Sequence, residues 1–355
     1  MSVRVLSFHA NYGCGHRGRC CTSGWPIAVD GSERTRLDQA LDAGLLVARP
    51  GFLGSDRALE GQRALRAADA EPDGPALLAS ASGRCVFHDD NASGGCRIHR
   101  AFGHSGLPLA CRQFPRQSVH DPRGVSVTLS HYCPTANDLL NAATGPASIL
   151  DGAPAFPADA EYIGLTADAA LPPLLHPRLA MDWESWWLFE ELSVSLLGDA
   201  PDPLSRLGVA VEYSREWAVG DRSLSAHLRD SFVRARHAIV PRCELSASRI
   251  ANRSADAVAA VPAEWRELAV ETLSAPAATE VDEAVVRRFL AAHAFASWTA
   301  YQGEGLRAWF RAVETAACLL RRTADPGAAD LVLRHLADSS ALVARWNRAE
   351  RAAIV

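Results

Sequence analysis

Cysteines are the residues of this chain whose type and spacing point most clearly to chemistry. Seven of the nine lie in the first 133 residues of a 355-residue sequence, and three fall within CGHRGRCC. The seven are Cys14, Cys20, Cys21, Cys85, Cys96, Cys111 and Cys133. Thiolates are soft ligands that favour Zn²⁺, Cu(I) and iron–sulfur clusters. The pattern therefore predicts a metal centre in the N-terminal part of the chain.

The expected location of the protein supports metal binding over disulfides. The start of the sequence, MSVRVLSFHANYG, lacks the pattern of a signal peptide, and no apolar run reaches the length of about 18 residues that a membrane helix needs. We therefore expect a cytoplasmic protein, in which thiols stay reduced. The odd number of cysteines agrees with metal binding or catalysis rather than with a set of disulfides.

The spacing leaves open how the ligands are grouped. The runs C-x5-C-C and C-x10-C match neither a zinc ribbon nor a ferredoxin motif. Neighbouring side chains of an extended backbone point to opposite sides, so Cys20 and Cys21 either serve two centres or provide one ligand and one packed thiol. His99, three residues after Cys96, could share a centre, and with it seven cysteines would fill two four-ligand sites.

Two arginines in the stretch CRQFPR are candidates for binding a cofactor. Arg112 and Arg116 stand on either side of a Phe-Pro pair. An arginine beside an anionic thiolate centre would stabilise the centre or bind a carboxylate of a cofactor. Salt bridges at the surface are the alternative role.

Composition excludes several classes of function. The net charge of −5 and the pI of about 6.2 give no basic surface for nucleic acid or an anionic membrane. All 36 basic residues are arginine, because the sequence contains no lysine. Schiff-base chemistry and a phosphate-binding loop with its lysine are therefore excluded.

The elements that would position the N-terminal cysteines are short. Residues 30–44 predict a helix with Asp30 or Ser32 as its N-cap, Glu33 in its first turn and Gly44 at its end. Residues 50–84 predict a loop with a helical piece. The alternating valines of RQSVHDPRGVSVTLSHYC predict a β-hairpin around DPRG, which would bring Cys111 near Cys133.

Helical periodicity dominates the rest of the chain. Residues 141–180 are rich in proline and alanine and predict a connection without regular structure. Residues 181–197 predict a helix with buried tryptophans and exposed Glu184, Glu190 and Glu191. Apolar residues share one helical face at Leu306, Trp309, Phe310, Val313, Ala317 and Leu320, and another at Val332, Leu336, Val343 and Trp346.

The predicted fold is mostly α, with a small irregular α+β cysteine-rich metal-binding module followed by a helical bundle. The predicted boundaries are 1–140 for the module, 141–180 for the connection and 181–355 for the helical domain. Cys243 and Cys318 lie in that helical domain, and we expect them to pack as small apolar side chains.

Five separated blocks occur in an order that resembles a known protein family. They are CGHRGRCCTSGWPIAVD, GRCVF, GGCRIHRAFG, ACRQFPR and LSHYCPTA, and the resemblance covers residues 8–137. Together they resemble the YkgJ-type cysteine cluster, a family of zinc- or iron-chelating proteins. The order Cys-Cys-x3-Trp, Gly-Cys-x-Ile, Cys-x2-Phe-Pro-Arg and Ser-x2-Cys-Pro is most similar to its flagellin lysine-N-methylase (FliB-like) branch.

The resemblance implies an iron–sulfur cluster of the [4Fe–4S] type. It also implies methyl transfer from S-adenosylmethionine to lysines of flagellin as the protein partner. The family usually has a further cysteine before the position of Cys14, and this chain has Phe8 and His9 there. His9 could replace that ligand as a nitrogen donor.

A second function stays open beside the methyltransferase. The sequence contains no conventional S-adenosylmethionine fingerprint. The alternative is a non-catalytic protein in which zinc or iron folds the N-terminal module and the helical body binds a partner. The metal and the sulfide bound to the protein would separate a cluster from zinc.

Overall fold

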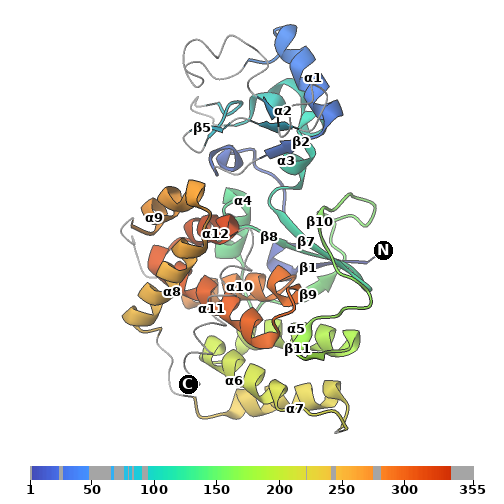
Figure 1. Cartoon of the computed structure of the whole chain (residues 1–355), viewed down its shortest axis with the longest axis vertical. Coiled ribbons are helices and arrows are strands. Elements are labelled where there is room, and N and C mark those ends of the chain that lie inside the picture. Colours follow the sequence, from blue (N-terminus) through green and yellow to red (C-terminus); the bar gives the residue numbers. More distant parts are fainter. Residues whose placement is uncertain are drawn as a thin grey trace. The chain divides into compact units, whose positions relative to one another are not determined.

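The computed structural model describes residues 2–23, 27–47, 65–67, 76–78, 80–81, 84–89, 95–220, 222–240, 245–274 and 281–336. The chain divides into two compact units (Figure 1). The smaller unit is Cys14–Pro115, and the larger unit joins Met1–Gly13 to Arg116–Val355. Residues 116–140, which we predicted to belong to an N-terminal module, are thus part of the larger unit, and so is the N-terminal strand.

Short elements make up the smaller unit. Its described helices are α1 (Gly31–Asp42), α2 (Arg97–Phe102) and α3 (Leu109–Gln113), with 3₁₀ turns η2 (Arg19–Thr22) and η4 (His104–Gly106). Its strands form a sheet β2–β4–β3 and a pair β5–β6. They are β2 (Ile27–Val29), β3 (Leu65–Ala67), β4 (Ala76–Leu78), β5 (Ser80–Ala81) and β6 (Arg84–Cys85). The described parts of 50–84 are therefore strands, where we predicted loop and helix.

Helix α1 confirms the helix predicted over 30–44. The Asp30 side chain accepts from the Glu33 backbone N–H at 2.8 Å, and the Glu33 side chain accepts from the Asp30 backbone N–H at 3.2 Å. This capping box satisfies two N–H groups at the start of the helix. The second carboxylate oxygen of Glu33 accepts from the Leu109 backbone N–H at 2.6 Å, so the same residue ties α1 to α3.

A five-stranded sheet with the order β10–β7–β8–β1–β9 lies in the larger unit. β1 runs parallel to β8 and antiparallel to β9, and β10 runs parallel to β7. Figure 1 shows β1, drawn in blue, among green strands that come much later in the chain. The strands are β1 (Ser2–Leu6), β7 (Arg116–Asp121), β8 (Gly124–Leu129), β9 (Ile149–Asp151) and β10 (Gly164–Thr166).

The predicted hairpin is confirmed as β7 and β8. Asp121 pairs with Gly124 at the turn. Gly124 has a φ of +130°, and a Cβ there would lie 2.3 Å from the Ser2 carbonyl oxygen, so only glycine lets β1 lie so close. The apolar residues that carried the prediction are all buried, namely Val119, Val125, Val127 and Leu129.

The segment predicted as a connection contains regular structure. Strands β9 and β10 extend the sheet, and β11 (Leu174–His176) pairs with β12 (Leu179–Ala180) as a separate hairpin. Each strand has two or three residues. Such strands are too short to show the alternation by which a sequence reveals a longer strand.

Helices form most of the larger unit, so the mostly α fold is confirmed. Helix α10 packs against α5 and α11, and α11 packs against α8 and α12. The described helices are α4 (Pro134–Ala142), α5 (Trp183–Asp199), α6 (Pro203–Arg215), α7 (Leu224–His237), α8 (Ala247–Ala260), α9 (Arg266–Ser274), α10 (Glu283–Ala294), α11 (Leu306–Thr323) and α12 (Pro326–His335). None of these described helices has the length and apolar character needed to cross a membrane.

Two predicted helices are confirmed by α5 and α11. Helix α11 buries Leu306, Trp309, Val313, Ala317 and Leu320, while Phe310 on that predicted face is half-buried. The other face is described only in part, because Val332 and Leu336 are buried and Val343 and Trp346 lie outside the described residues.

One prediction for α5 is wrong. Glu184 and Glu191 are exposed as expected, but Glu190 is buried with only 1% of its side chain accessible. Its carboxylate lies 2.7 Å from a nitrogen of Arg4 and 3.1 Å from one of Arg123. Burial of a carboxylate requires such partners, and both come from segments far away in the sequence.

Candidate functional site

Five thiols from four segments of the smaller unit gather at its apolar core. Cys21 and Cys85 are buried beside Val86, Phe87 and Ile98, and three further cysteines pack against the same residues. The five, called the cysteine core below, are Cys20, Cys21, Cys85, Cys96 and Cys111. Side-chain hydrogen bonds join the Cys21 thiol to Cys20, Cys85 and Cys96. The fold thus brings together five of the seven cysteines predicted as ligands.

The adjacent pair Cys20 and Cys21 lies in the 3₁₀ turn η2 rather than on an extended strand. The two thiols are joined by a side-chain hydrogen bond, so the expectation that they point to opposite sides is wrong. Gly18 precedes the turn with a φ of +69°, and a Cβ there would lie 2.6 Å from the Gly95 backbone nitrogen. Glycine at this position lets η2 approach the segment that carries Cys96.

Backbone pairing holds Cys85 and Cys96 in place. Cys85 is the last residue of β6, and Cys96 is the N-cap residue of α2. Between them the Asp89 backbone N–H donates to the Gly95 carbonyl at 2.9 Å. Because the backbone on both sides of the loop is tied, two thiols that are distant in the sequence face the same core.

The thiols of the cysteine core hold their protons unequally. The hydrogen bond with Cys21 lowers the pKa of Cys20 and lowers that of Cys96 to about 7. Hydrogen bonds with its neighbours raise the pKa of Cys21, which therefore keeps its proton and donates. Burial, followed by the charges of Cys85 and Cys20, raises the pKa of Cys111. A metal would displace these protons, because only thiolates ligate.

Two further candidates of the smaller unit, Cys14 and His99, each contact His16. Cys14 is exposed, and its Sγ lies 3.6 Å from the His16 Nδ1 atom. The His16 ring stacks on the ring of His99 with 3.8 Å between centroids. Burial, followed by the charge of His16, lowers the pKa of His99. Cys14 is not among the cysteines that pack in the cysteine core.

Cys133 and His9 belong to the larger unit and have partners there. The Cys133 Sγ lies 3.7 Å from the Tyr12 hydroxyl oxygen. His9 is fully buried in the 3₁₀ turn η1 (Ser7–His9), and its Nε2 lies 3.2 Å from the His131 Nε2. Because Cys111 and Cys133 fall in different units, their approach across the hairpin stays a prediction.

The two candidate arginines are likewise divided between the units. Arg112 lies in α3, and its guanidinium donates to the Ser105 carbonyl at 3.3 Å. Arg116 begins β7 in the larger unit, with its guanidinium 5.6 Å from the ring centroids of Tyr12 and Phe156. Their role in cofactor binding stays a prediction. Of the two other cysteines, Cys318 is buried in α11 as expected, and Cys243 lies outside the described residues.

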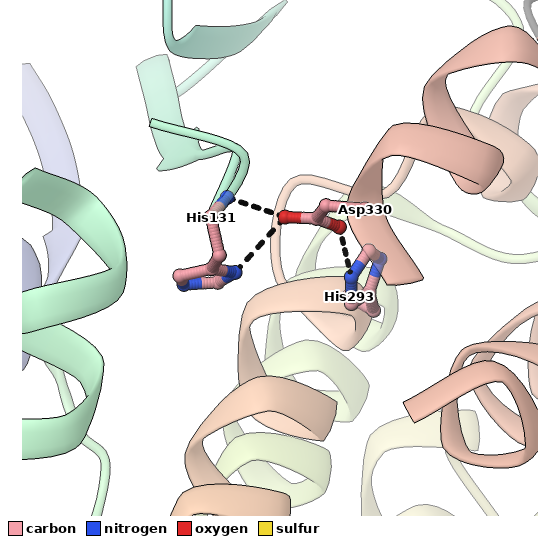
Figure 2. A group of neighbouring side chains, drawn as sticks. All are labelled: His131, His293 and Asp330. Carbon is pink, nitrogen blue, oxygen red and sulfur yellow. Dashed lines mark hydrogen bonds and ion pairs between the residues drawn. The ribbon is translucent and has the colours of Figure 1, made fainter. Parts of the chain in front are cut away.

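A second group of chemically capable side chains lies in the larger unit (Figure 2). His131 follows β8, His293 lies on α10 and Asp330 lies on α12. One carboxylate oxygen of Asp330 accepts from the His131 Nδ1 at 3.0 Å and also from the His131 backbone N–H. The other oxygen lies 2.9 Å from the His293 Nε2. These three residues, called the His–Asp group below, place a donor atom each within 4.8 Å of the others.

Burial and neighbouring side chains shift the pKa values of His131 and Asp330. Burial lowers the pKa of His131, while the hydrogen bond with Asp330 opposes that shift. Burial and the charge of His131 lower the pKa of His9. Burial by itself would raise the pKa of Asp330, but the charge of His293 and the His131 hydrogen bond hold it far below its usual range. A buried aspartate anion thus accepts a hydrogen bond from His131 and lies 2.9 Å from the His293 Nε2.

A cavity of about 270 Å³ opens beside this group. His293 and Asp330 line it together with Trp298, Thr315 and Arg334. Burial lowers the pKa of Arg334 to about 10, so its guanidinium keeps its charge at neutral pH. The cavity therefore combines a carboxylate, an imidazole and a cation with apolar walls, as ligand-binding pockets commonly do.

Sequence reasoning missed His293 and Asp330. Each interrupts an apolar run, FLAAHAFA in one case and GAADLVL in the other. A polar residue in such a run indicates a buried side chain that needs a partner. That signal does not say which partner, because α10, α12 and the end of β8 are far apart in the sequence.

Comparisons of the chain with models of protein families, with curated proteins and with solved structures found no match. The function therefore has to be argued from the two groups of side chains described above.

Proposed function

We propose that the smaller unit is a metal-binding unit in which thiolates of the cysteine core hold an iron–sulfur cluster. The observation that carries the proposal is the convergence of five thiols from four segments on one apolar core. The chance that unrelated apolar cysteines meet in this way is small, since a cysteine that only fills apolar space needs no other cysteine beside it.

The donor set fits such a group. An iron–sulfur cluster or a structural zinc ion takes four ligands, and the cysteine core offers five thiols, four of which share hydrogen bonds through Cys21. Four would ligate, and the fifth would pack or donate a hydrogen bond to a ligand sulfur. The surrounding apolar residues exclude water, which protects a cluster and adjusts its potential.

Metal and sulfide analysis of the full chain, purified without oxygen, tests this proposal. We expect iron and acid-labile sulfide in equal amounts, with the visible absorption of a cluster. Stoichiometric zinc without sulfide would mean that the cysteine core is a structural zinc site rather than a cluster site. That result would favour the non-catalytic alternative. Protein without bound metal would refute both.

Two cysteine variants show where the metal is bound. Cys96→Ser removes a thiol of the cysteine core and is expected to lose most of the iron and sulfide. Cys318→Ser removes a buried thiol of the larger unit and is the matched control, which is expected to retain both. Equal metal content in the two variants would mean that Cys96 is not one of the four ligands.

Methyl transfer from S-adenosylmethionine to lysines of a flagellin-like protein is the activity that the family resemblance implies. The resemblance alone supports this part of the proposal. Incubation of the metal-loaded chain with flagellin and labelled S-adenosylmethionine tests it. Because the chain contains no lysine, any methyl-lysine must come from the added protein. Metal-loaded chain that neither binds S-adenosylmethionine nor methylates would favour the non-catalytic metal protein.

A further inference from the structure

We propose that His131, His293 and Asp330 bind a divalent transition-metal ion in the larger unit, at a site without cysteine ligands. Nitrogen and oxygen ligands lie about 2.1 Å from such an ion, so two ligands at a right angle are about 3.0 Å apart. The His131 Nδ1 lies 3.0 Å from one carboxylate oxygen of Asp330, and the His293 Nε2 lies 2.9 Å from the other. Two imidazoles and one carboxylate are also the ligands of many iron and zinc enzymes.

The orientation of His293 supports an ion between the donors. Its Nε2 is buried and lies 2.9 Å from an oxygen of Asp330, yet it makes no hydrogen bond of acceptable geometry. Leaving a buried ring nitrogen without such a bond is costly. A cation that accepts the lone pair of this nitrogen removes that cost, because the nitrogen then has a ligand bond instead.

His9 supplies the support that a histidine ligand needs. When a metal occupies the Nδ1 of His131, the remaining ring proton of His131 lies on Nε2. That atom is 3.2 Å from the His9 Nε2, which can accept the proton's hydrogen bond. Ligand histidines almost always donate their second ring N–H in this way, which fixes the ring. The sequence suggested His9 as a metal ligand. In this site His9 would instead accept a hydrogen bond from the ligand His131.

The cavity gives the ion access to further ligands. His293 and Asp330 form part of its wall, so coordination positions that the protein leaves open would face a space of about 270 Å³. Arg334 lines the same space. A divalent ion with one aspartate and a guanidinium nearby has excess positive charge, so the ligand that completes the site is expected to be an anion such as a carboxylate.

Mn²⁺ is the probe for the test, because it prefers oxygen and nitrogen ligands and binds thiolates poorly. Mn²⁺ is titrated into the full chain, and free Mn²⁺ is measured by electron paramagnetic resonance. We expect one ion per chain in the wild type. We expect His293→Gln to weaken binding by more than about 100-fold, because a ligand is lost.

Two controls separate this site from other effects. His227→Gln changes another half-buried histidine, whose Nε2 lies 2.8 Å from the Tyr213 carbonyl oxygen, and should leave Mn²⁺ binding unchanged. Cys96→Ser should also leave it unchanged, so loss of the cysteine centre and loss of this site are distinguishable. Asp330→Asn provides a second ligand variant.

The opposite results would overturn the proposal. Wild-type protein that binds no Mn²⁺ would show that Asp330 only orients two histidines. Binding that survives in both folded ligand variants, His293→Gln and Asp330→Asn, would show that the ion lies elsewhere. Circular dichroism of each variant establishes that it is folded before its binding is judged.

Discussion

Glu190 illustrates at the scale of single residues what a buried charge requires. Two arginines neutralise its carboxylate, and the backbone N–H of Ala296 donates to it at 3.1 Å. Arg123 also binds Asp121 at 2.5 Å, so four charges form one network between the sheet and α5. The sequence shows none of this, because the partners are distant and a Glu in an amphipathic helix is usually exposed.

We expect Glu190→Gln to lower the free energy of unfolding of the larger unit by about 3 kcal/mol, because Arg4 and Arg123 then share one carboxylate in a buried site. Urea denaturation followed by circular dichroism measures the change. The neighbouring Glu191 is exposed, so Glu191→Gln is the control and should alter stability by less than about 0.5 kcal/mol. Equal effects of the two substitutions would contradict the network.

A residue-scale prediction also follows for His9. His9→Gln keeps all three ligands of the His–Asp group and removes the ring that supports His131. Mn²⁺ affinity is expected to fall by about 10- to 100-fold, less than in His293→Gln. The Mn²⁺ titration described above provides the measurement. An unchanged affinity would mean that His9 has no part in holding the ligand.

At the scale of elements, the structures that depend on residues close together in the sequence were predicted correctly. Those that depend on contacts between distant residues were not. The capping box of α1 and the β7–β8 hairpin were predictable, because residues within a few positions determine them. The turn η2 was not, since its conformation depends on the contact between Gly18 and Gly95. The spacing of the cysteines led to the prediction that they are ligands, which stays a prediction, and only the fold shows that Cys20 and Cys21 lie in the same core.

Glu33 completes the capping box of helix α1 and also accepts a hydrogen bond from the backbone of α3. We expect Glu33→Ala to cost the smaller unit about 1 to 2 kcal/mol, because it breaks the capping box and the bond to α3, which carries Cys111. Loss of metal to a chelator should be faster as a result, as followed by visible absorption. Asp42→Ala, at the exposed end of the same helix, is the control. Equal rates in both variants would refute this link.

At the scale of the whole molecule, the chain is divided differently from its sequence pattern. The predicted boundaries lay at residues 140 and 180, but β1 and β7 to β10 join the two segments of the larger unit into one sheet. The smaller unit is thus inserted between β1 and β7. A single sequence shows helices and hairpins, but it does not show that its first strand pairs with β8.

We expect metal removal to unfold the smaller unit alone, because the cysteines form part of its limited apolar core. Limited proteolysis before and after treatment with a chelator tests this, with cleavage sites mapped by mass spectrometry. New cleavage should fall within Cys14–Pro115, while the larger unit stays protected. Cleavage spread evenly over both units would contradict the independence of the two.

X-ray absorption spectroscopy of the metal in the full chain identifies the atoms that bind it. We expect a first shell of sulfur atoms, at about 2.3 Å if the metal is zinc, and we expect Cys96→Ser to lose this shell while Cys318→Ser keeps it. A first shell of nitrogen and oxygen alone in the wild type would contradict a metal centre held by the cysteine core.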